Sequence, residues 1–156
     1  MGVKDPLVGL LNIGAEDLKG NSLTMETYSL LKQAHINFYG NIEARDIPSS
    51  EVNVIVCDGF VGNALLKFGE GLVKMFYGLI KDCANQSVLT KLGGMCLLPA
   101  LKEMRKNLDW EESGGAPLLG VNNVSIVCHG SSDAHAVKSA VKVAQKCVNN
   151  NFIQHM

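Results

Sequence analysis

Four short segments of the sequence combine glycine with a polar or titratable residue where an apolar run stops. They read NIG (12–14), YGN (39–41), CDG (57–59) and CHGSSD (128–133). Amides and hydroxyls of this kind donate hydrogen bonds to an oxyanion, a carboxylate or imidazole moves a proton, and glycine lets backbone approach a ligand. In any one segment taken alone, ordinary turn formation explains Gly, Asn and Asp better than a binding site does. If all four lie at one edge of a sheet, a binding site explains them equally well.

The segment HGSSD (129–133) is the sharpest of these signals. Gly130 turns the chain out of a strand, and Ser131, Ser132 and Asp133 lead into a helix. Free N–H groups at a helix N-terminus, with hydroxyls nearby, can bind phosphate. A simple Ser or Asp helix cap, worth ~1 kcal/mol, explains the same residues. The carboxylate of Asp133 also opposes an anion close by.

Arg45, in NIEARD (41–46), offers a bidentate clamp for an anion. The commoner arrangement for an arginine on such a loop is an ion pair with a neighbour, here Glu43 or Asp46. Both interpretations stay open at this stage.

Several familiar kinds of site are absent from the sequence. It has no Walker loop, no GxGxxG, no HExxH and no CxxC. Cys128 and His129 are adjacent on a predicted strand, so their side chains point to opposite faces and cannot form a dyad. The five cysteines are an odd number without metal-ligand spacing, which favours reduced, mostly buried thiols in a cytoplasmic protein. We therefore expect no metal site and no cofactor.

Apolar runs and helical patterns alternate along the chain and must position these residues. Strands are predicted at 7–14, 36–41, 53–57 and 123–130, the first buried on both faces. Helices are predicted at about 22–34, capped by Asn21 or Ser22, and at about 61–84 and 133–149. We expect Gly93 and Gly94 to interrupt the pattern and Pro99 to begin a new helix. The predicted apolar face of the last helix contains Val137, Ala140, Val141, Ala144 and Cys147.

This order predicts the fold class and bounds the function. Strands alternating with helices indicate an α/β fold with a mostly parallel sheet flanked by helices, in which ligands bind at the carboxyl ends of the strands. The 156 residues amount to about one domain. A net charge of −1 gives no general attraction to nucleic acid. No apolar run reaches ~18 residues, so we expect no membrane span, and the N-terminus has no apolar signal-peptide region.

The stretch 88–108 has a different character, because basic residues are interleaved with leucine and methionine. Its basic residues are Lys91, Lys102, Arg105 and Lys106. A basic amphipathic helix can lie on an anionic lipid surface. More commonly such a helix packs against its own protein or a partner subunit.

Five segments together resemble a known family. VGLLNIGAEDLKGN, INFYGNIEARDI, VIVCDGFVGNALLK, GGAPLLGVN and HGSSDAHAVKSAV resemble the C-terminal half of the bacterial phosphate acyltransferases of phospholipid synthesis (the PlsX family, acyl-ACP:phosphate acyltransferases). The likeness covers about Leu7 to Val148. It assigns 6–150 to that half domain, with 61–108 as a helical segment facing a membrane or a dimer partner, and 1–5 and 151–156 as tails.

The resemblance implies a fold similar to phosphotransacetylases and to isocitrate and isopropylmalate dehydrogenases. It implies that inorganic phosphate attacks the thioester of a fatty acyl carrier protein to give acyl phosphate. It also implies a cytoplasmic homodimer that associates peripherally with the membrane. Family members are about twice as long, so we expect a fragment that lacks part of the active site. The alternatives are a non-catalytic α/β module that binds an anion or the carrier protein, and a lipid-surface or dimerisation module.

For this reaction the sequence supplies candidates for each role. Asp58 or His129 would manage a proton or orient another residue. The candidates for binding phosphate or substrate are Asn12, Asn41, Arg45, Gly59, Asn63, Gly130, Ser131, Ser132 and Asp133. The candidates for lipid contact are Lys91, Lys102, Arg105 and Lys106.

Overall fold

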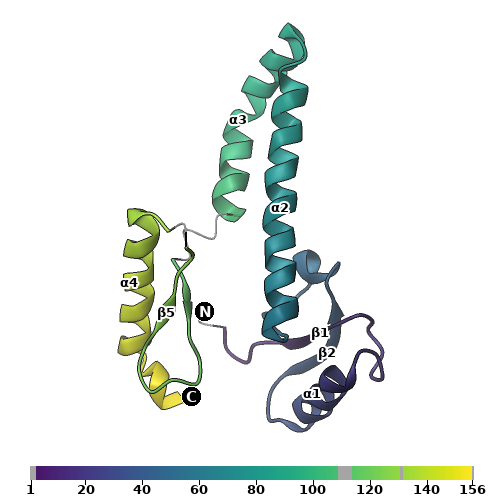
Figure 1. Cartoon of the computed structure of the whole chain (residues 1–156), viewed down its shortest axis with the longest axis vertical. Coiled ribbons are helices and arrows are strands. Elements are labelled where there is room, and N and C mark those ends of the chain that lie inside the picture. Colours follow the sequence, from purple (N-terminus) through teal and green to yellow (C-terminus); the bar gives the residue numbers. More distant parts are fainter. Residues whose placement is uncertain (1–2, 109–113, 131, 156) are drawn as a thin grey trace. The chain divides into compact units, whose positions relative to one another are not determined.

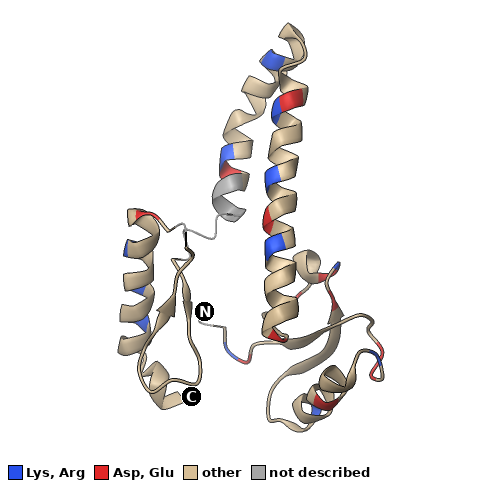
Figure 2. Ribbon diagram, in the orientation of Figure 1, with Lys and Arg blue, Asp and Glu red and all other residues tan. Residues whose placement is uncertain are grey.

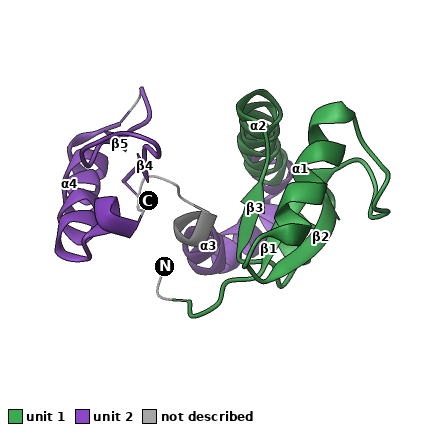
Figure 3. Cartoon of the chain, turned by 90° about the horizontal axis from the view of Figure 1, so that it is seen from below, with its two compact units in different colours: residues 1–80 green, residues 81–156 purple. Residues whose placement is uncertain are grey.

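A computed structural model describes residues 3–108, 114–130 and 132–155 of the chain. The chain forms two compact units, residues 1–80 and residues 81–156 (Figure 3).

The first unit holds a three-stranded parallel sheet. Its elements are β1 (Val8–Asn12), α1 (Ser22–Gln33), β2 (Phe38–Glu43), a 3-10 turn (Ile47–Ser49) and β3 (Val54–Val56), followed by α2 (Gly59–Ala84), which continues into the second unit (Figure 1). The strand order is β2-β1-β3, with Leu10 opposite both Asn41 and Val56. The predicted α/β fold with a parallel sheet is therefore confirmed.

The core of this unit forms around the central strand, β1. All five residues of β1 are buried, as the sequence predicts for a strand covered on both faces, and Leu10 and Ile42 are nearly inaccessible. A Cβ at Gly9 would lie 3.1 Å from Ile42 Cγ2 and 3.2 Å from Val52 Cγ1, so a larger residue there would require these side chains to shift slightly.

Helix α1 begins where the sequence predicts, and its cap explains why. The Asn21 side chain accepts a hydrogen bond from Thr24 N (2.9 Å), and Thr24 Oγ1 accepts one from Asn21 N (3.0 Å). This reciprocal capping box satisfies donors that the first turn leaves unpaired. The rings of Tyr28 and Phe38 meet edge to face at 5.3 Å and hold α1 against β2.

The second unit has a separate, antiparallel pair of strands. Its elements are α3 (Val88–Leu108), β4 (Ala116–Pro117), β5 (Ile126–Val127), α4 (Ala134–Asn149) and a 3-10 turn (Phe152–His155). The expected fourth strand of the parallel sheet, 123–130, is wrong: within the described residues only 126–127 are extended, and they pair with β4. Residues 116–117, which follow Gly114 and Gly115, provide that partner strand.

Glycine explains why this stretch forms a strand beside β5. A Cβ on Gly115 (φ +151°) would lie 2.6 Å from Val127 O, and one on Gly114 (φ +75°) would collide with backbone atoms of Ser139 and Ala140 in α4. Only glycine permits both positive φ values and both approaches. The two glycines of GGAP (114–117) therefore allow this stretch to pack closely against β5 and α4.

The predicted apolar face of α4 is partly wrong. Ala136, Ala140 and Cys147 are buried, as predicted for Ala140 and Cys147, whereas Val137 is 50% exposed and Val141 is 64% exposed. Small side chains line the buried stripe because the neighbouring backbone comes close to the helix. The two valines lie off this stripe.

Two further expectations are wrong. Helix α3 runs without a break through Gly93, Gly94 and Pro99, so Pro99 lies inside the helix and begins no new one. Gly94 permits a close turn, since a Cβ there would lie 2.9 Å from Ala84 Cβ at the end of α2.

All cysteines are free, but only Cys147 is buried; the exposed ones are Cys57, Cys83, Cys96 and Cys128. No described helix is both long enough and apolar enough to span a bilayer.

Candidate functional site at the carboxyl edge of the parallel sheet

The three parallel strands of the first unit end at one edge, and two predicted site residues lie in these strands. The sequence predicts that the second strand ends at Asn41, but β2 continues to Glu43. Asn12 ends β1 and Asn41 lies in the neighbouring strand β2. Both side chains reach the loop 13–20, called the β1–α1 loop below. Asn12 Nδ2 donates to Lys19 O (2.9 Å), and Asn41 Nδ2 donates to Glu16 O (2.8 Å).

These two asparagines differ in how fully their amides are paired. Asn12 is 8% exposed, and its Oδ1 accepts a hydrogen bond from Ile13 N (2.9 Å). Asn41 is 4% exposed, and its Oδ1 is buried without a hydrogen-bond partner in the described part of the chain. A buried acceptor left unpaired costs about 1–3 kcal/mol. The donors that the sequence assigns to a ligand are therefore used on loop carbonyls here, and one acceptor is left over.

Gly20 fits the β1–α1 loop around Asn12. Its φ is +104°, and a Cβ there would lie 2.5 Å from Asn12 Oδ1 and also collide with Thr24 Oγ1. A side chain at this position would displace both the asparagine and the helix cap. The role of this glycine was not predicted, since its only signal in the sequence is a Gly-Asn pair just before the helix.

A cluster of three polar side chains holds the outer side of the same loop. Asp17 accepts hydrogen bonds from Tyr28 Oη (2.7 Å) and Lys32 Nζ (3.2 Å), and Lys32 Nζ lies 5.6 Å from the centre of the Tyr28 ring. We call Asp17, Tyr28 and Lys32 the loop clasp. Sequence reasoning missed it. The i,i+4 spacing of Tyr28 and Lys32 was visible, but nothing in the sequence places a loop aspartate between them.

The clasp shifts the ionisation of its members. Hydrogen bonds from Tyr28 and then Lys32 lower the pKa of Asp17 below its usual 3.8. The hydrogen bond to Asp17 raises the pKa of Tyr28 above 10.0 and that of Lys32 above 10.5. All three groups are exposed, so solvent screens these interactions.

Asp58 follows β3 and caps helix α2. Its Oδ1 accepts hydrogen bonds from Phe60 N (2.9 Å) and Val61 N (3.0 Å). This is the turn-and-cap arrangement that the sequence left open, and a role for Asp58 with a proton stays a prediction. A Cβ on Gly59 would have nothing within 4 Å, and Asn63 is exposed in the first turns of α2.

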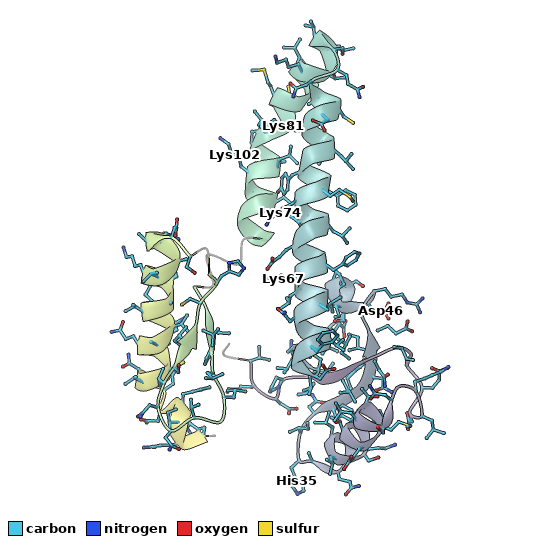
Figure 4. The ribbon with its side chains drawn as sticks, in the orientation of Figure 1. His35, Asp46, Lys67, Lys74, Lys81 and Lys102 are labelled. Atoms are coloured by element: carbon cyan, nitrogen blue, oxygen red, sulfur yellow. The ribbon has the colours of Figure 1, made fainter. Side chains whose placement is uncertain are left out.

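Arg45 forms the ion pairs expected of an exposed loop arginine. Its Nη2 lies 3.0 Å from Glu43 Oε1, and its Nε lies 3.8 Å from Asp46 Oδ1; Figure 4 labels Asp46. Exposed pairs of this kind contribute roughly 0–1 kcal/mol. Of the two interpretations of Arg45, the ion pair with its neighbours is therefore the one observed. An anion would have to compete with two carboxylates for this side chain.

The described residues of HGSSD, which are His129, Gly130, Ser132 and Asp133, lie in the second unit before α4. Ser132 donates to His129 O through its N–H (3.1 Å) and through its hydroxyl (2.7 Å). Asp133 caps α4 by accepting a hydrogen bond from Ala136 N (2.8 Å). The cap is thus present, Gly130 has open space around it, and Ser131 lies outside the described residues. Asp58 and Asn12 belong to the first unit, so a site that they share with His129 stays a prediction.

Helix α3 exposes apolar side chains along its described length. Val88, Leu89 and Met95 are all largely exposed, and long stretches of α2 and α3 carry no charge (Figure 2). Lys91 and Lys102 are eleven residues apart, about three turns, and so lie on one face; Figure 4 shows Lys102 on α3. The side chains of Arg105 and Lys106 lie outside the described part of the chain. Among the described residues, no group of three His, Cys, Asp or Glu side chains is placed to hold a metal ion.

These features define the class of protein: an α/β protein whose parallel strands end in amide and carboxylate side chains beside a pinned loop. Its sequence matches the family described as "Fatty acid synthesis protein" over residues 1–155. The chain belongs to this family, and the predicted resemblance is confirmed.

Curated relatives agree with this assignment. The chain is 54% identical over 153 residues to a phosphate acyltransferase of Moorella thermoacetica, covering 98% of this chain and 45% of that protein. It is 54% identical to the phosphate acyltransferase of Heliobacterium modesticaldum, covering 98% and 46%, and 48% identical to that of Clostridium botulinum, covering 100% and 47%. The chain therefore spans about half the length of the curated relatives it matches.

Proposed function

We propose that this chain contributes to the transfer of a fatty acyl group from acyl carrier protein to inorganic phosphate, in a cytoplasmic enzyme of phospholipid synthesis. The observation that carries the proposal is the match to the family over 1–155, with phosphate acyltransferases about half identical to the chain. The polar strand ends of the first unit support it, because Asn12 and Asn41 bring amide groups to the edge where parallel sheets bind ligands.

The chemistry needs few groups from the protein. A phosphate oxygen attacks the thioester carbonyl, the C–S bond breaks, and the thiolate leaves and takes up a proton, which gives acyl phosphate and free carrier protein. Donors must hold phosphate and the oxyanion that develops on the carbonyl. We assign these contacts to Asn12, Asn41 and Asn63 and to the turn at Ser132. Asp58 or His129 is assigned the proton.

The test is phosphate-dependent loss of the acyl carrier protein thioester. It compares this chain alone with the chain supplemented by the remaining half of a curated relative. Asp58→Asn keeps a side chain that caps α2 but cannot take a proton, so it should slow turnover without lowering stability. Asp82→Asn is the matched control, because it removes an exposed carboxylate of α2 to which no role is assigned. No thioester loss with both halves present would contradict the proposal, and phosphate binding without turnover would favour the non-catalytic module.

A second candidate function concerns α3, whose exposed apolar and basic side chains favour contact with an anionic lipid surface or a second copy of the chain. Sedimentation with vesicles of phosphatidylglycerol tests the lipid contact. Lys91→Glu and Lys102→Glu should weaken the association, whereas Lys138→Glu on α4 should not. Association that is equal at low and high salt and unaffected by these changes would contradict this function.

A further inference from the structure

The hydrogen bonds of Asn12 and Asn41 place main-chain carbonyl oxygens on the amide groups that we assign to substrate. Glu16 O lies 2.8 Å from Asn41 Nδ2, and Lys19 O lies 2.9 Å from Asn12 Nδ2. A carbonyl oxygen and a phosphate oxygen are both acceptors, so the two compete for the same donors. In the observed arrangement the β1–α1 loop occupies the sheet edge itself.

The same arrangement leaves one hydrogen bond unmade. No donor reaches Oδ1 of Asn41 in the described part of the chain, although the residue is 4% exposed. Asn12, by contrast, is paired on both sides of its amide. The unpaired acceptor destabilises this position of the loop, and a shift that exposes Asn41 Oδ1 to water, which can donate a hydrogen bond, would remove that penalty.

The loop clasp opposes such a shift from the outer side. Asp17 is the only member that belongs to the loop, and Tyr28 and Lys32 hold it from α1. The clasp is exposed, so it is a weak restraint. The loop is held by a weak clasp and by the amide of Asn41, which has one unpaired acceptor. We therefore expect two positions of the loop that differ little in free energy.

We propose that the β1–α1 loop is a self-blocking lid: it opens by releasing the clasp, and phosphate oxygens then replace the carbonyls of Glu16 and Lys19 on Asn41 and Asn12. The identity of the ligand rests on the proposed function; the two positions of the lid do not. Asn41 and Asn12 bind the ligand in the open state, and Tyr28 and Lys32 are positioning residues.

The first measurement needs no ligand. NMR relaxation dispersion on the full chain should show exchange at the backbone amides of 13–20 and at the side-chain amides of Asn12 and Asn41. Tyr28→Phe removes one clasp hydrogen bond and should raise the open population about two- to five-fold. Lys32→Met should act in the same direction. Tyr39→Phe is the matched control, because Tyr39 is 59% exposed and its hydroxyl makes no hydrogen bond with the described residues.

The second measurement is a titration with inorganic phosphate, against chloride at equal ionic strength. Phosphate should shift the side-chain amide signals of Asn12 and Asn41, and Tyr28→Phe should tighten the apparent dissociation constant by the same two- to five-fold, because a larger fraction is open. A merely structural tyrosine would weaken binding when removed.

The outcomes separate the lid from the proposed function. A loop without exchange in both the wild type and Tyr28→Phe, or equal effects of Tyr28→Phe and Tyr39→Phe, overturns the lid. Asparagine signals that do not respond to phosphate overturn the displacement of the carbonyls. If the asparagines respond as expected but no thioester is lost with both halves present, the lid stands and the proposed function fails.

Discussion

Replacing Gly20 with alanine should destabilise the first unit, because its positive φ is unfavourable for alanine and the new Cβ would clash with neighbouring side chains. The φ of +104° is strained for any other residue, and the new Cβ would lie 2.5 Å from Asn12 Oδ1. The left-handed backbone costs about 1–2 kcal/mol, and displacing Asn12 leaves buried polar groups unpaired at about 1–3 kcal/mol. Alanine also stiffens the unfolded chain, which returns roughly 0.4–1 kcal/mol. The expected net loss is about 1–4.5 kcal/mol in the free energy of unfolding.

The assay is urea unfolding followed by circular dichroism, with Gly69→Ala as the matched control. Gly69 lies in α2 of the same unit, and a Cβ at this position would have nothing within 4 Å. Alanine should therefore stabilise α2 by roughly 0.5–1 kcal/mol. If Gly20→Ala unfolds within ~0.5 kcal/mol of the wild type, the usual range of surface changes, then Gly20 does not hold Asn12 and the account of the loop is wrong.

Three further predictions concern the clasp, the turn at Gly114 and the cap of α2. Because the pKa of Asp17 is lowered in the folded state, the clasp contributes its full stability above pH 3.8 and loses it as the pH falls through the folded-state pKa. Because the pKa of Tyr28 is raised, the clasp contributes its full stability below pH 10.0 and loses it as the pH rises through the folded-state pKa. The stability difference between wild type and Tyr28→Phe, from urea titrations across the pH range, should shrink at both ends, and a flat difference would refute this. Gly114→Ala should destabilise the second unit by about 2–4 kcal/mol in thermal unfolding, since it meets the backbone of α4 at positive φ; Gly93→Ala in α3 should not. Asp58→Ala should cost about 1 kcal/mol through loss of the α2 cap, and Asp58→Asn should cost far less; equal costs would show that the cap is not the reason.

Local physical chemistry made much of the first unit predictable. The run 7–14 contains no charge, and β1 is buried throughout as expected. Asn21 caps α1 because its side chain reaches a backbone N–H within the same turn, an interaction that needs no distant partner. The family was also visible in the sequence, because its motifs are local strings of residues.

Long-range pairing decided what the sequence left open. Whether 126–127 joined the parallel sheet or paired with 116–117 depended on which backbone could approach, and Gly114 and Gly115 open the second route. In α4 the closeness of that backbone selected small residues for the buried stripe, so Val137 and Val141 stayed exposed despite their hydrophobicity.

At the strand edge, the sequence by itself determined which amides and carboxylates are present. It also placed Asn12 and Asn41 in strands of a parallel sheet, although Asn41 lies inside β2 and not at its end as predicted. Only the tertiary structure showed that loop carbonyls occupy their donors, that Asn41 keeps an unpaired acceptor, and that Asp17 is held by α1. The physical reason is that residue type fixes what a side chain can bond to, whereas the partner it finds is set by contacts between segments far apart in the chain.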